Sequence, residues 1–149
     1  MEGYLKLYGK AWDDLLVQPY IGGEEYTVSV IVNNLNALVG IVPKRVISKR
    51  GITRVAVSES NKEIEKTCLK IVKQFNPQGP FNVQLKLWKG KVYIFEINPR
   101  LSTTAVLTEK VFANEVELYL EHRNKLEIPK IPKMKKGVFL YRYEENVFK

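Results

Sequence analysis

The sequence predicts an α+β domain with a mostly antiparallel β-sheet and helices packed on one face. Residues 26–32 alternate with the two-residue period of a strand, with Tyr or Val at every even position. Two further strand-like segments, 81–88 and 92–98, flank Lys89-Gly90-Lys91, which is typical of a β-hairpin. Residues 60–75 instead carry apolar side chains at helical spacing, so strands and helices occupy separate blocks of the chain.

The expected elements follow one another as strands, helix, hairpin, helices and a last strand. Ser60 is predicted to cap the first helix, with Glu63 three positions later in a capping box, and Asn76-Pro77 to end it. Cys68 lies on the apolar face of this helix, so we expect it to pack rather than react. The remaining expected elements are strands at 15–20, 37–47, 52–57 and 137–143, and a helical stretch at 104–125 with a break near 113–114.

Composition restricts the class of protein. We expect a single domain, 1–149, because 45% of the residues are hydrophobic and no apolar run approaches the roughly 20 residues of a membrane helix. One Cys and one His exclude an internal disulfide and a zinc cluster, and no signal peptide is recognisable, so we expect a cytoplasmic setting. The net charge of +8 suits nucleic acid, nucleotide phosphates or an acidic partner surface, and equally an ordinary basic surface.

The register of the hairpin decides which side chains share a face. A two-residue turn at Lys89-Gly90 would place Glu96 among the apolar side chains of the first strand, whereas a three-residue turn ending at Lys91 places it opposite Gln84. Because a slip of one residue exchanges the two faces, and a buried carboxylate is costly, we predict the three-residue turn. The apolar face would then consist of Val83, Leu85, Leu87, Tyr93, Phe95 and Ile97.

Three oxygen donors are therefore expected to converge on the polar face of this hairpin. Gln84 and Glu96 would lie directly across from each other, roughly 5 Å apart at Cβ, with Asn98 two residues further along. Hard oxygen ligands of this kind are what Mg²⁺ prefers. Arg100 follows on the next loop, where its guanidinium can bind a phosphate bidentately. The same residues would also suit the solvated face of an ordinary hairpin.

Two motifs resemble those of a known family. Residues 95–100, Phe-Glu-Ile-Asn-Pro-Arg, preceded by Asn82-Val83-Gln84, resemble the metal-binding signature of ATP-grasp enzymes. The Gln-Glu-Asn set and residues 101–104, Leu-Ser-Thr-Thr, are most similar to the ATP-grasp domains of carbamoyl phosphate synthetase. Upstream, residues 17–28 resemble the adenine hinge of the family followed by its ribose-binding acid. The resemblance is clear over 18–104 and implies the C-terminal subdomain of the ATP-grasp fold.

The resemblance implies a role for each matching residue of the signature. Gln84, Glu96 and Asn98 would hold Mg²⁺, or Mn²⁺ in its place, against the ATP phosphates. Arg100 would stabilise charge on the transferred phosphoryl group or on an acyl phosphate. Lys49 lies where relatives often have a residue that contacts phosphate or substrate, although Lys49 and its basic neighbours also suit a solvated face.

The hinge residues would hold the nucleoside of ATP. Tyr20 and Ile21 would meet the adenine, with Gln18 at the entrance of the hinge, and Glu25 would accept hydrogen bonds from the ribose hydroxyls. The implied reaction phosphorylates a carboxylate from ATP and passes the acyl phosphate to an amine or ammonia, with release of ADP.

The chain departs from the family at its N-terminus. Only 17 residues precede Gln18, and they contain no Gly-rich lid and no phosphate-binding lysines of the family. We therefore expect that a partner chain or a missing N-terminal segment supplies these parts, and that the exposed docking surface favours self-association. Two other hypotheses are a non-catalytic nucleotide-binding or interaction module, and a nucleic-acid-binding β-domain, which the charge and aromatics such as Trp12, Tyr20 and Trp88 would suit.

Overall fold

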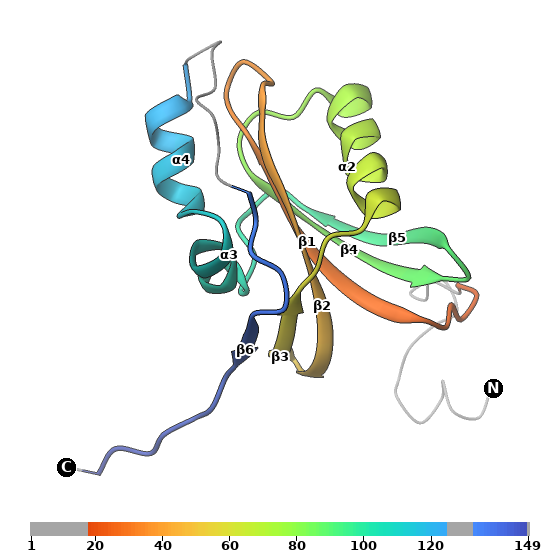
Figure 1. The fold of residues 1–149 in the computed structure, drawn as a ribbon, viewed down its shortest axis with the longest axis vertical. Coiled ribbons are helices and arrows are strands. Elements are labelled where there is room, and N and C mark those ends of the chain that lie inside the picture. The colour runs from red at the N-terminus through yellow and green to blue at the C-terminus, as the bar shows by residue number, and fades with distance from the viewer. Residues whose placement is uncertain (1–17, 125–132, 149) are drawn as a thin grey trace, which may run out of the picture.

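The computed structural model describes residues 18–124 and 133–148 (Figure 1). Within these ranges the elements are β1 (Glu24–Val32), β2 (Leu38–Arg50), β3 (Ile52–Ser58), α2 (Lys62–Phe75), β4 (Phe81–Trp88), β5 (Lys91–Asn98), α3 (Ala105–Val111), α4 (Glu115–His122) and β6 (Phe139–Tyr141). The predicted order of strands, helix, hairpin, helices and strand is confirmed, and so is the α+β class.

The strands form one antiparallel sheet in the order β5-β4-β1-β2-β3-β6. β1 lies inside the sheet, because it pairs with β2 along one side and with β4 along the other. Residues 26–32 of β1 are buried at every position, so both faces of the sheet are covered at its centre.

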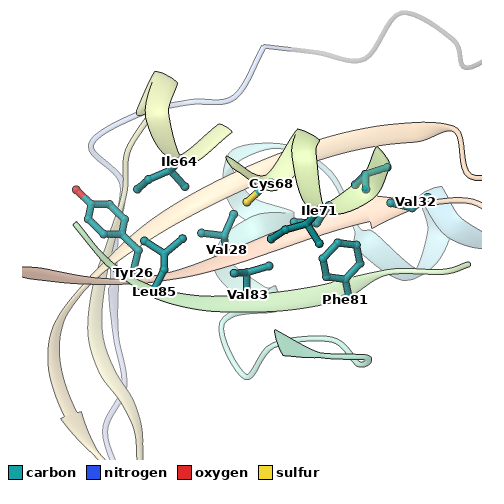
Figure 2. Packing of buried hydrophobic residues seen from close by; sticks show 11 residues of the cluster. Tyr26, Val28, Val32, Ile64, Cys68, Ile71, Phe81, Val83 and Leu85 are labelled. Atoms are coloured by element: carbon teal, nitrogen blue, oxygen red, sulfur yellow. The ribbon is translucent and has the colours of Figure 1, made fainter. Parts of the chain in front are cut away.

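α2 covers one face of the sheet and forms the main core with β1 and β4 (Figure 2). The core consists of Tyr26, Val28, Val30, Val32, Ile64, Cys68, Ile71, Val72, Phe81, Val83 and Leu85. Cys68 packs as predicted, and its burial raises the pKa of the thiol to about 12, which keeps it in the unreactive protonated form.

The first turn of α2 differs from the prediction. Asn61, not Ser60, is the N-cap, and its side-chain oxygen accepts from the backbone N–H groups of Glu63 and Ile64. Asn and Ser are comparable capping residues, so the sequence pattern alone does not choose between neighbours. The helix ends as predicted at Asn76, which adopts the left-handed conformation at φ 48°.

α3 and α4 lie on the opposite face of the sheet from α2, so the expectation of helices on a single face is wrong (Figure 1). Ser29, which alternates with Val28 and Val30 along β1, contacts Thr108 of α3 and Glu115 of α4. The physical reason is that β1 is buried on both sides and needs a cover on each. The predicted break near 113–114 is confirmed: α3 ends at Val111, and α4 begins at Glu115.

The β4–β5 hairpin has the predicted pairing of Gln84 with Glu96, but its turn and its register differ from the prediction. The turn has two residues, Lys89 and Gly90, both at positive φ, and not the predicted three. A bulge then shifts the register at Phe95, between the Gln84–Glu96 pair and the Leu85–Ile94 pair.

This bulge also changes which side chains of β5 share a face. On the face of Leu85 and Leu87 lie Ile94 and Val92 rather than the predicted Phe95 and Tyr93. Ile97, which pairs with Val83, is on the expected side.

Smaller differences concern the ends of strands. β2 runs three residues beyond the predicted end and finishes at Arg50, and β6 is shorter than the predicted 137–143. Of the strand expected at 15–20, residues 18–20 form no strand, and residues 15–17 lie outside the described ranges. No helix within the described ranges is long and apolar enough to cross a membrane.

Candidate functional site

A row of polar side chains crosses the sheet on the face that carries α3 and α4. The strand register places its members side by side in the order Glu96, Gln84, Thr27, Lys44 and Ser58. Directly paired residues of neighbouring strands point to the same side, so the row forms a continuous stripe over β5, β4, β1, β2 and β3.

One end of this row opens into a hollow of about 280 Å³, which we call the Gln84–Glu96 hollow. Its lining includes predicted site residues from four strands and one loop: Glu25 of β1, Lys49 of β2, Gln84 of β4, Glu96 of β5 and Arg100. Residues separated by up to 75 positions in the sequence therefore meet on one side of the sheet.

The polar side chains of this hollow contact one another directly. Lys49 Nζ donates to Glu25 Oε1 at 2.9 Å and to Gln84 Oε1 at 3.2 Å. Gln84 Nε2 donates to a carboxylate oxygen of Glu96. Gln84 and Glu96 therefore point to the same side of the sheet, as the predicted metal set requires.

The donor set fits a hard divalent cation. Gln84 Oε1 already faces a positive charge, the Lys49 ammonium, and the Glu96 side chain is exposed at the edge of the hollow. Amide and carboxylate oxygens are the protein ligands that Mg²⁺ accepts before phosphate and water complete its shell. The described ranges hold no group of three or more His, Cys, Asp or Glu that could hold a metal ion.

Asn98, the third predicted ligand, is placed differently from the other two. It ends β5 opposite Asn82 and is not among the residues that line the hollow. Its Nδ2 atom is buried without a hydrogen-bond partner in the part of the chain that the structure describes. A buried amide with an unused polar group is costly, so Asn98 is a residue for which a bound ligand would improve the hydrogen bonding.

The predicted hinge residues lie beside the hollow and not in its lining. Gln18 and Tyr20 are exposed, Tyr20 at 89%, and Ile21 is half-buried. The ammonium of Lys86 lies 5.1 Å from the centroid of the Tyr20 ring. Lys86 also pairs with Glu25 across β4 and β1, which connects the hinge to the predicted ribose-binding acid.

Sequence reasoning singled out residues 101–104 but gave no site role to the hydroxyl groups of Thr27, Ser102 and Thr104, of which the first two line the hollow. Thr27 Oγ1 donates to Asn82 Oδ1 at 2.7 Å and lies 3.2 Å from Ser102 Oγ. Ser102 Oγ in turn lies 2.8 Å from Thr104 Oγ1. The polar residues Glu25, Thr27 and Ser29, at alternate positions of β1, were a sequence signal for this polar face.

Sequence reasoning also missed Lys44, which is fully buried in the polar row. Its Nζ donates to Ser29 Oγ at 2.6 Å and to Thr108 Oγ1 at 2.7 Å, and Ser29 donates to the buried carboxylate of Glu115. Burial lowers the pKa of Lys44 to about 8, and the charge of Glu115 acts in the opposite direction. We call Lys44, Ser29, Thr108 and Glu115 the Lys44 network; it joins β1 and β2 to α3 and α4.

The fold matches solved enzyme structures over most of this chain. The phosphoribosylaminoimidazole carboxylase ATPase subunit from Aquifex aeolicus is matched over 87% of this chain and 47% of its own, with TM-score 0.63 and 17% identity. N5-carboxyaminoimidazole synthetase from Staphylococcus aureus, complexed with ADP, is matched over 75% of this chain and 32% of its own, with TM-score 0.63 and 16% identity. Phosphoribosylglycinamide synthetase from Anaerococcus prevotii is matched over 80% of this chain and 34% of its own, with TM-score 0.57 and 18% identity.

At 16 to 18% identity these matches show a shared fold, and the chain spans about half or less of the length of each matched structure. The family model described as "ATP-grasp in the biosynthetic pathway with Ter operon" matches residues 11–146. The chain therefore belongs to this ATP-grasp family. The resemblance to ATP-grasp enzymes is confirmed, while the carbamoyl phosphate synthetase-like subtype stays a prediction.

Proposed function

We propose that this chain is the ATP- and Mg²⁺-binding part of a ligase that joins a carboxylate to an amine or ammonia through an acyl phosphate. The observation that carries the proposal is the meeting of Glu25, Lys49, Gln84, Glu96 and Arg100 around one hollow. Four strands and one loop each contribute a charged or amide side chain to this hollow, which is more than the polar face of a single hairpin supplies.

Each residue has a defined task in this proposal. Gln84 and Glu96, with Asn98 beside them, hold Mg²⁺, which neutralises charge on the ATP phosphates when it is bound. Lys49 donates to a phosphate oxygen. Arg100 stabilises the charge of the phosphoryl group during its transfer.

The nucleoside is held at the other side of the hollow. Glu25 accepts hydrogen bonds from the ribose hydroxyls, and the segment Gln18 to Ile21 meets the adenine. A carboxylate oxygen of the substrate then attacks the γ-phosphorus and releases ADP, and the amine nitrogen attacks the acyl carbon and expels phosphate.

A second polypeptide segment completes the site in this proposal, either a partner chain or a part of a longer native chain. Support comes from the matched enzymes, which are two to three times longer than the region they share with this chain. Phosphoryl transfer needs charge neutralisation from several sides, and a second segment would supply further cationic groups around the phosphates. A cytoplasmic setting, expected from the cysteine content, belongs to the same proposal.

Thermal unfolding in the presence of Mg-ATP tests the proposal. We expect Mg-ATP to raise the melting temperature of the wild type, by an amount that corresponds to about 2.7 kcal/mol at a hundredfold excess over Kd. Glu96→Ala should remove this shift, because it deletes the single carboxylate of the metal set. Glu109→Ala removes an exposed carboxylate of α3 and should leave the shift unchanged.

The outcomes separate the hypotheses. A shift that persists in Glu96→Ala refutes the metal assignment. Stabilisation by single-stranded DNA with a steep salt dependence, and none by Mg-ATP, would favour the nucleic-acid-binding domain. A non-catalytic module would share the Mg-ATP shift but release no ADP once the missing segment is supplied.

A further inference from the structure

A second hollow, of about 340 Å³, lies next to the Gln84–Glu96 hollow and is lined by arginines. Its lining residues are Ser48, Arg50, Arg54, Arg142 and Glu144. They come from β2, from β3 and from the segment that follows β6, and we call this region the arginine hollow. None of them has a task in the nucleotide site proposed above.

Contacts within the arginine hollow fix two of the three guanidinium groups. Arg142 donates its backbone N–H to the carbonyl of Arg54 at 2.8 Å, and its guanidinium donates to the carbonyl of Thr103 at 2.7 Å. Arg54 forms an ion pair with the carboxylate of Glu144. Arg50 forms no hydrogen bond or ion pair with any residue that the structure describes, so its guanidinium is available.

The two hollows adjoin at the loop of Thr103. Lys49 and Arg50 are consecutive residues of β2 and point to opposite sides of the strand, so they make no link between the hollows. Thr103, whose carbonyl accepts from Arg142, also lines the Gln84–Glu96 hollow. A molecule with one end in the arginine hollow and the other at the proposed transfer site would therefore pass the loop of Thr103.

The charges in the arginine hollow indicate the chemistry of its ligand. Three guanidinium groups against one carboxylate leave two positive charges in excess. A phosphate monoester carries about −1.5 to −2 charges at neutral pH and has three acceptor oxygens. Guanidinium groups bind such oxygens bidentately, with a planar fork that an ammonium lacks.

We propose that the arginine hollow binds the phosphate monoester group of a substrate of the ligase, on either the carboxylate or the amine component. This inference rests on the proposed function, because it takes the neighbouring hollow as the place of transfer. Arg50 and Arg54 hold the phosphate group. Arg142 is a positioning residue that fixes the loop at Thr103 between the two hollows.

Glu144 shows that the arginine hollow accepts an anionic group. Its carboxylate pairs with Arg54, while the Glu144 side chain is 78% exposed and can turn away into solvent. A phosphate monoester would compete with this carboxylate for Arg54. Removal of the negative charge of Glu144 should therefore tighten binding, whereas removal of Arg50 should weaken it.

Titration of the full chain with glycerol 3-phosphate, followed by NMR chemical shifts, tests the inference. We expect Arg50→Gln to raise Kd by about fivefold and Glu144→Gln to lower it by a similar factor. Arg123→Gln removes an exposed arginine outside the hollow and should change Kd less than twofold. Neither Arg50→Gln nor Glu144→Gln should alter the affinity for Mg-ATP.

Three results would overturn the inference. Glycerol 3-phosphate could fail to bind, or its binding could depend on Lys49 and not on Arg50 and Glu144, which would place the phosphate in the Gln84–Glu96 hollow. Succinate could bind with the same affinity and the same dependence on Arg50, which would make the ligand a carboxylate. If glycerol 3-phosphate binds as expected but Mg-ATP does not, the phosphate-binding site stands, and the proposed ligase function fails together with the assignment of the phosphate to its substrate.

Discussion

Gly23 lies two residues before Glu25, at the point where the hinge segment enters β1. Its φ is +84°, and a Cβ atom there would lie 2.2 Å from the carbonyl oxygen of Leu87. Both the left-handed backbone and the close approach to β4 require glycine. The position of Glu25 beside Lys49 therefore depends on a glycine two residues upstream.

Gly23→Ala is expected to destabilise the protein by about 3 kcal/mol, from left-handed strain plus a steric collision with backbone. Gly90→Ala is the matched control: its φ is +73°, but nothing lies within 4 Å of a Cβ there. The control should cost only about 1 to 2 kcal/mol. Urea unfolding of both variants measures the difference, and equal losses would contradict the predicted collision.

Sequence reasoning identified some residues of the candidate site and missed others, and single positions show why. Gln84 and Glu96 were found because alternation along a strand assigns side chains to faces before the fold is known, whereas Glu25 was found only through the resemblance to ATP-grasp enzymes. Lys44 was missed because its burial depends on α3 and α4, which are distant in the sequence. Between Pro43 and Arg45 a lysine looks like a surface residue, and only tertiary packing shows otherwise.

At the scale of elements, the Lys44 network should produce a characteristic pH dependence of stability. The pKa of Lys44 is lowered from 10.5 to about 8 in the folded state. Between these values the unfolded chain binds the proton and the folded chain releases it, so the free energy of unfolding rises with pH. Titration of Lys44 raises the free energy of unfolding by about 3 kcal/mol between its folded-state and unfolded-state pKa values. Below pH 8 Lys44 is protonated in both states, so it causes no change of stability with pH there.

Two other buried groups act against this rise at higher pH. Cys68 and Tyr26 have raised pKa values in the folded state, so their contribution to stability is lost as pH rises above about 9 and 10. The difference between wild type and Lys44→Met isolates the lysine, because the two opposing groups are present in both proteins. Urea unfolding at pH 7 to 10.5 should show this difference increasing from pH 8, and a constant difference would refute the lowered pKa.

The β4–β5 hairpin shows what pattern reasoning can and cannot determine at this scale. Burial correctly selected the pairing of Gln84 with Glu96, since the alternative places a carboxylate in the core. The sequence could not distinguish a three-residue turn from a two-residue turn followed by a bulge at Phe95, because both produce this pair. Tyr93 and Phe95 were assigned to the wrong face for this reason.

The whole molecule presents an apolar sheet edge that the described residues leave uncovered. β5 is the outermost strand on its side of the sheet, and no described segment pairs with its outer edge. Ile94, Phe95 and Ile97 on this strand are 40 to 44% exposed. Free strand edges with apolar side chains promote association between chains, and natural proteins usually protect them with charges or a cover.

We therefore expect the isolated chain to self-associate through the β5 edge, with an apparent mass that rises with protein concentration in sedimentation equilibrium. Ile94→Lys places a charge on this edge and should shift the equilibrium toward monomer, since lysine is the common protecting residue of free strands. Val106→Lys is the matched control, because it replaces an exposed apolar residue of α3 away from the edge.

A wild type that stays monomeric up to about millimolar concentration would contradict the prediction. An equal effect of both variants would assign the association to general hydrophobicity. A segment that supplies the missing part of the site and also covers β5 should suppress self-association when it is added to the wild type.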